Sequence, residues 1–89
     1  MLYMVLESFR GGRPGAVYAR FRELGRLAPE GLRYVGSWVT EDGTQCFQVM
    51  ECDDRALLDA WMAAWSDLVE FSVTPVLTSA EAAARFTPP

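Results

Sequence analysis

The sequence predicts an α+β domain in which two helices cover one face of a four-stranded antiparallel sheet. Two observations carry this prediction. The apolar patterns follow one another in the order strand, helix, strand, strand, helix, strand, and an Asp-Gly pair separates the second strand from the third. The 89 residues make a single domain, with a core over 1–77 and a short C-terminal helix over about 79–86.

The first strand is the apolar run 2–9, which ends before the two glycines at 11–12. Pro14 suits the first turn of a helix, and Pro29 and Gly31 stop that helix. The apolar residues between them recur at helical spacing and are Val17, Phe21, Leu24 and Ala28.

An Asp-Gly pair at 42–43 lies between two strand-like runs, 32–40 and 45–52, and predicts a hairpin. Asp53 or Asp54 caps the helix that follows. The buried stripe of this helix has helical intervals and consists of Leu57, Leu58, Trp61, Met62, Trp65 and Leu68.

The fourth strand is 69–77, where Pro75 indicates an edge strand or an interruption of the pairing. Thr78 and Glu81 have the spacing of a capping box, which opens the C-terminal helix. The βαββαβ order is that of the ferredoxin-like split βαβ motif. Both main helices then cover one face of the sheet, and the other face is either exposed to solvent or buried against another molecule or segment.

Counting outward from the turn pairs Trp38 with Phe47 and Tyr34 with Glu51. One face then carries Tyr34, Gly36, Trp38, Thr40, Gln45, Phe47, Val49 and Glu51. The other carries Arg33, Val35, Ser37, Val39, Cys46, Gln48, Met50 and Cys52. We assign the first, aromatic set to the open face. Gln48 would need a partner under the helices, so the reverse assignment stays open.

Composition excludes several classes of protein. The net charge is -4 with no histidine and no basic patch, which argues against nucleic-acid binding. We expect a soluble cytoplasmic protein, because the N-terminus lacks a signal-peptide pattern and no apolar run approaches the roughly 20 residues of a membrane span. Cys46 and Cys52 lie in one strand, too far apart for a disulfide, and are expected to be free thiols.

The missing histidine also limits the chemistry. No catalytic triad forms without a histidine base, and no cluster has metal-ligand spacing, so we expect no metal and no cofactor. Glu51 is the candidate for acid–base work, with Tyr34 beside it, because desolvation at the end of an apolar face raises a carboxyl pKa. The alternative is a solvated carboxylate or one paired with arginine. Arg33 either holds an anion or is solvated.

The rings of Tyr34, Trp38 and Phe47 are the candidate ligand-binding residues, since they can stack on a planar ligand. They serve equally well as a contact between two copies of the chain. An aromatic face should not be left in water, so we expect a homodimer in which two open faces meet, with a pocket between them.

The element order, the start Met1-Leu2-Tyr3-Met4-Val5 and the run at 47–51 before an Asp-capped helix resemble the dimeric α+β barrel superfamily. That superfamily includes cofactor-free monooxygenases and muconolactone isomerase-like proteins. The segments 31–35, 37–39, 46–51 and 65–68 resemble more closely a small bacterial family of unknown function. Several enzymes of the superfamily use a cavity histidine, and this chain has Met4 near the corresponding place.

Two hypotheses follow. The first is a dimeric protein that binds a small hydrophobic or aromatic molecule on the open sheet face and performs monooxygenase- or isomerase-like chemistry. The second is a non-catalytic module for self-association or partner binding. Neither requires nucleic acid or a membrane.

Overall fold

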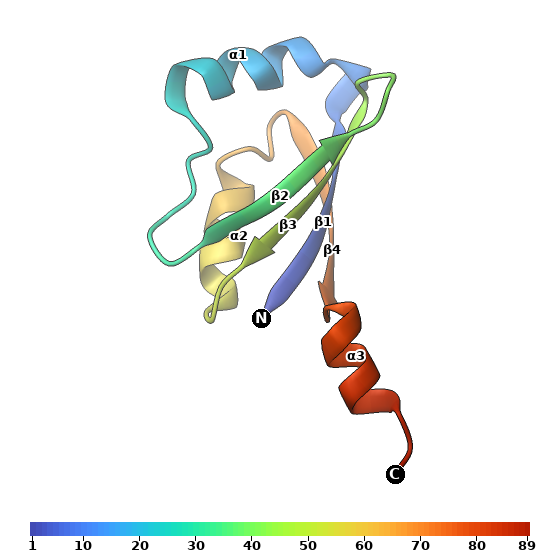
Figure 1. The fold of residues 1–89 in the computed structure, drawn as a ribbon. Helices are drawn as coiled ribbons and strands as arrows, with labels where there is room; N and C mark the ends of the chain where they lie inside the picture. Colours follow the sequence, from blue (N-terminus) through green and yellow to red (C-terminus); the bar gives the residue numbers. More distant parts are fainter.

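The computed structural model describes residues 1–89 and contains the expected order of elements (Figure 1). The strands are β1 (Leu2–Phe9), β2 (Arg33–Val39), β3 (Gln45–Glu51) and β4 (Val69–Val76). The helices are α1 (Pro14–Leu24), α2 (Arg55–Ala63) and α3 (Ser79–Phe86), with a 3-10 turn η1 (Arg10–Gly12) before α1. The four strands form one antiparallel sheet in the order β2-β3-β1-β4, consistent with a ferredoxin-like fold. Pro75 therefore lies on an edge strand, as its missing N–H requires.

Alternating burial along β1 and β3 identifies the face beneath α1 and α2, which we call the helix side. On β1 the buried residues are Tyr3, Val5, Glu7 and Phe9, and on β3 they are Cys46, Gln48 and Met50. Trp61 and Trp65 join them in the core as predicted. The helix itself is shorter than its apolar stripe predicts, because α2 ends at Ala63 and Trp65 and Leu68 lie in the turns that follow. The assignment of β3 is thus confirmed, with Phe47, Val49 and Glu51 on the opposite, open face.

The register of the β2–β3 hairpin is confirmed near the turn and wrong at its far end. Trp38 pairs with Phe47 as expected, but the register shifts between Tyr34 and Gly36, so that Tyr34 faces Met50 and Arg33 faces Glu51. The extra residue is Val35, and a β-bulge of this kind exchanges the two faces beyond it. Tyr34 therefore points to the helix side, whereas Arg33 and Val35 line the open face.

The first helix is shorter than its apolar spacing predicts. It ends at Leu24, because Gly25 takes a left-handed conformation with φ 73° and begins a loop that reaches β2 at Arg33. Arg20 links α1 to the turn between α2 and β4 through two hydrogen bonds to Asp67, of 2.8 and 2.6 Å. Asp54, rather than Asp53, caps α2 by accepting from the Ala56 amide.

No helix covers the open face, and Figure 1 shows that α3 extends away from the sheet beyond β4. Only the start of α3 borders this face, where Thr78 and Glu81 lie beside Arg33 and Glu51. Thr78 and Glu81 form the expected capping box at the start of α3, and none of the residues of this helix is buried. Both cysteines are buried free thiols. No helix of the chain has the length and apolar character needed to cross a membrane.

Candidate functional site

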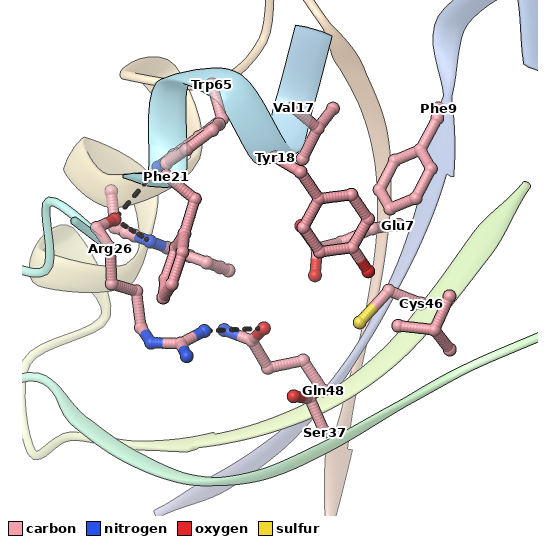
Figure 2. A pocket seen from close by; sticks show the side chains of 12 residues that line it. Glu7, Phe9, Val17, Tyr18, Phe21, Arg26, Ser37, Cys46, Gln48 and Trp65 are labelled. Atoms are coloured by element: carbon pink, nitrogen blue, oxygen red, sulfur yellow. Dashed lines mark hydrogen bonds between the residues drawn. The ribbon is translucent and has the colours of Figure 1, made fainter. Parts of the chain in front are cut away.

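A cavity of about 230 Å³ lies on the helix side of the sheet, between α1, α2 and strands β1, β2 and β3 (Figure 2). Its apolar wall is formed by Phe9, Val17, Tyr18, Phe21, Val39, Trp61 and Trp65. The polar side chains that reach it are Glu7, Arg26, Ser37, Cys46 and Gln48. An apolar cavity with a few convergent polar groups is the usual form of a small-molecule site.

The backbone of Arg26 is fixed by the two tryptophans of the core. The Nε1 atoms of Trp61 and Trp65 both donate to the Arg26 carbonyl oxygen, at 3.1 and 2.9 Å. The residues on either side, Gly25 and Leu27, have φ of 73° and 63°. A left-handed leucine is strained, so the α1–β2 loop holds Arg26 in one specific place.

The side chain of Arg26 lies flat within the cavity wall. Its Nη1 donates to Gln48 Oε1 at 3.1 Å, and its guanidinium stacks 3.7 Å from the centre of the Tyr34 ring. Phe21 contacts it from another side, with its ring centre 5.2 Å away. Cation–π contacts of this kind keep the charge fixed while leaving the donors at the edge of the group available.

Glu7 is the buried carboxyl of the cavity. It points to the helix side directly across from Cys46 of β3 and forms no ion pair. Burial raises the pKa of Glu7 above its ordinary value, and the Cys46 thiol and the Arg26 charge offset part of that rise. Burial and the neighbouring Glu7 raise the pKa of Cys46 to about 12. The thiol is therefore a poor nucleophile, and Glu7 is the group suited to proton transfer.

The site residues expected from sequence do not form one site. Glu51 accepts two hydrogen bonds from Arg33, of 2.9 and 2.6 Å, in an ion pair at the end of the open face. Trp38 and Phe47 pair across β2 and β3 on that same face, where both are exposed. Tyr34 lies on the opposite face, where its hydroxyl bonds with Ser37 at 2.7 Å and its ring supports Arg26. A hollow of about 330 Å³ at the end of the open face is lined by Glu51 and Arg33, and it contains none of Tyr34, Trp38 and Phe47. The single open-face cavity expected to hold all four candidate residues is therefore wrong.

Glu7, Arg26 and Gln48 are the site residues that sequence analysis missed. A signal for Glu7 was present, because it occupies an inward position of the alternating strand β1 among apolar residues. Gln48 was noticed as a residue in need of a partner, and the partner is Arg26. A helix that continued to Ala28, as the apolar spacing predicts, would place Arg26 opposite its apolar stripe, and only the early end of α1 brings Arg26 to the cavity.

No group of three or more His, Cys, Asp or Glu side chains lies close enough together to hold a metal ion. Among known proteins, the model of a family described as a domain of unknown function (DUF3303) matches residues 1–88. No curated protein and no solved structure matches the chain. The expected resemblance to a family of unknown function is confirmed, and the wider resemblance to the dimeric barrel proteins stays a prediction.

Proposed function

The chain belongs to the DUF3303 family, whose function is unknown, and we propose from its own geometry that it binds a small, largely apolar molecule in the helix-side cavity. The observation that carries this proposal is the cavity itself, in which a buried carboxyl without an ion pair meets a wall of aromatic rings. A cavity of about 150 Å³ accommodates benzene, so about 230 Å³ suits a compound of one ring with a short side chain.

We further propose that Glu7 exchanges a proton with the bound molecule. A carboxyl whose pKa is raised by burial keeps its proton to a higher pH than an exposed carboxyl does and can act as a general acid or base. Isomerisation by proton transfer, or oxygenation without a cofactor, are the reaction classes that such a group serves. Glu7 thereby takes the role first assigned to Glu51 and Tyr34, whose contacts are with Arg33 and with Arg26 and Ser37.

Binding is tested with a neutral aromatic probe, trans-cinnamamide, followed by backbone NMR. We expect shift changes at Tyr18, Cys46 and Gln48 on the cavity wall and none at Trp38 and Phe47. The carboxyl of Glu7, followed in the same titration, should show a further rise in pKa when it donates to the amide oxygen of the probe. Shift changes confined to the open face would contradict the proposal.

A pair of variants separates cavity binding from surface binding. Val17 is buried against the cavity, so Val17→Phe fills part of the space and should weaken cinnamamide binding at least about tenfold. Ala19 is exposed on the same helix, and Ala19→Phe should leave binding as in the wild type. Equal effects of the two variants would remove the helix-side cavity as the binding site.

A second proposal concerns the open face, because a separate observation favours it. Apolar side chains exposed or half-exposed there include Leu2, Met4, Leu6, Val35, Trp38, Phe47 and Val49. Contiguous apolar surfaces of this kind mark interaction sites. We propose that two copies pair their open faces as a homodimer, the arrangement of a dimeric α+β barrel. Helix α3 projects from the domain with Phe86 72% exposed, as expected for a helix that contacts a partner subunit.

Pairing through the open face alone would give the non-catalytic module of the alternative hypothesis. The two proposals are independent, since the cavity and the open face lie on opposite sides of the sheet. Light scattering at micromolar concentration should give twice the chain mass of 9.9 kDa. A mass of one chain would contradict the dimer and leave the cavity proposal standing.

A further inference from the structure

We infer that Arg26 anchors the acidic end of the ligand, so that the cavity selects a small aromatic or unsaturated carboxylate over its neutral analogues. This inference rests on the proposed binding function and adds the chemical class of the ligand. Its basis is the state of the Arg26 guanidinium, which lines the cavity and has most of its hydrogen-bonding capacity unused.

The number of protein acceptors distinguishes Arg26 from a purely structural arginine. A guanidinium carries five N–H donors, and Arg26 donates once, from Nη1 to Gln48. Arg20, by comparison, makes three hydrogen bonds, to both carboxylate oxygens of Asp67 and to the Ala64 carbonyl. Nε and Nη2 of Arg26 donate to no protein group, which leaves room for the two-pronged hydrogen bonding that a carboxylate offers.

The place of Arg26 is fixed before any ligand arrives. Its carbonyl accepts from two tryptophan N–H groups, and its guanidinium rests on the Tyr34 ring. Leu27 beside Arg26 takes a left-handed φ of 63°, and strained backbone of this kind is common at ligand sites. A charge held in advance loses little entropy on binding an anion.

The other charged group of the cavity defines the second end of the ligand. Figure 2 shows Glu7 and Arg26 on different walls, Glu7 beside Tyr18 and Arg26 beside Gln48. They form no ion pair, although Arg26 is near enough to lower the pKa of Glu7. A ligand between them places its carboxylate on Arg26 and presents a carbonyl, hydroxyl or acidic C–H group to Glu7. Phe21 and Trp65 contact the ring that joins these two ends.

The test compares two probes of nearly equal shape, trans-cinnamate and trans-cinnamamide, by NMR titration near neutral pH. A charge-assisted hydrogen bond adds enough free energy for roughly a tenfold to hundredfold gain in affinity, so the wild type should bind the acid that much more tightly than the amide. Arg26→Gln should abolish this preference by lowering the affinity for the acid more than the affinity for the amide. Arg22 is exposed on α1 and outside the cavity, so Arg22→Gln makes the same change of charge and should keep the preference.

The outcomes are distinct. If the wild type binds both probes with equal affinity, or prefers the amide, the inference is wrong and the binding proposal survives. If Arg26→Gln keeps the wild-type preference, the anion is held elsewhere and Arg26 is not its anchor. If neither probe binds at millimolar concentration, the binding proposal fails and the inference fails with it. The wild-type comparison tests whether the cavity prefers the acid even where a variant does not fold.

Discussion

Gln48 Oε1 accepts a hydrogen bond from Arg26 Nη1 at 3.1 Å. By this bond the buried Gln48 of β3 positions the guanidinium of Arg26, which lies in the α1–β2 loop. The amide nitrogen of Gln48 donates to Met50 Sδ at 3.2 Å, which fixes the orientation of the side chain. A glutamine that is 3% exposed would otherwise lower stability. Its contact with Arg26 makes this polar core position part of the cavity wall.

Replacing Gln48 tests this relationship. Gln48→Leu keeps the volume and removes the acceptor, and we expect the free energy of unfolding to fall by about 1–2 kcal/mol, since a hydrogen bond to a charged group contributes more than a neutral one. The measurement is urea unfolding followed by circular dichroism, with all proteins at one concentration. Gln45→Leu is the matched control, because Gln45 donates to the Ser8 hydroxyl at 3.1 Å in a neutral hydrogen bond. An equal or smaller loss in Gln48→Leu would contradict the assignment.

The buried carboxyl of Glu7 predicts how stability depends on pH. Its pKa in the folded protein lies above the ordinary value of 4.5, chiefly because of burial. Between the ordinary and the raised value the folded state binds a proton that the unfolded chain has already lost, so stability falls as the pH rises through that window. Glu7→Gln has no such proton, and its stability should depend less on pH across the same window.

The measurement is urea unfolding of the wild type and Glu7→Gln at several pH values from about 4 to about 8. Glu23→Gln, which changes an exposed carboxyl on α1, should keep the wild-type profile. Identical pH profiles for the wild type and Glu7→Gln would show that Glu7 ionises as freely in the folded protein as in the unfolded one.

The fold was predictable because its signals are local. The alternation in β1 and β3, the Asp-Gly hairpin and the capping box at Thr78 each depend on neighbours in the sequence, and each appears in the structure. The need of Gln48 for a hydrogen-bonding partner was also predictable from the sequence. Its side chain points toward the helices because the residues two positions away on β3, Cys46 and Met50, are apolar and buried on that side.

The candidate site was not predictable in the same way, since it depends on two departures from regular structure. One extra residue at Val35 moves Tyr34 to the helix side, and the only local signal for a bulge there is the neighbouring Gly36, which does not fix where the register shifts. The left-handed Gly25 ends α1 early, which turns Arg26 from an outer helical position into the cavity. Both changes are stabilised by tertiary contacts, such as the tryptophan hydrogen bonds to Arg26, that sequence spacing does not contain.

A glycine at the end of the α1–β2 loop gives a prediction for stability. Gly31 has φ 93°, and a Cβ added there would lie 2.9 Å from Leu57 Cδ1 of α2. We expect Gly31→Ala to lower the free energy of unfolding by about 1–2 kcal/mol, chiefly through backbone strain, because the end of the Leu57 side chain can shift. Gly15 is the control, since it lies within α1 with nothing within 4 Å of an added Cβ. Gly15→Ala should raise stability by about 0.5 kcal/mol. A Gly31→Ala protein as stable as the wild type would mean that the loop takes another path.

The proposed dimer predicts a specific response to charge on the open face. Trp38 and Phe47 pair across two strands there, 63% and 41% exposed. Phe47→Glu would place an unpaired carboxylate inside the interface, and leaving such a charge desolvated costs about 3 kcal/mol, so the dimer should weaken at least about a hundredfold. Leu24 is 56% exposed on α1, and Leu24→Glu adds the same charge to a surface outside the interface.

Light scattering should give the mass of one chain for Phe47→Glu and of two chains for Leu24→Glu. The opposite result would place the contact on the helices and leave the open face without a partner, and a change in both would indicate a general effect of charge. Because the cavity lies across the sheet from Phe47, the monomeric variant should still bind trans-cinnamamide, which separates assembly from ligand binding.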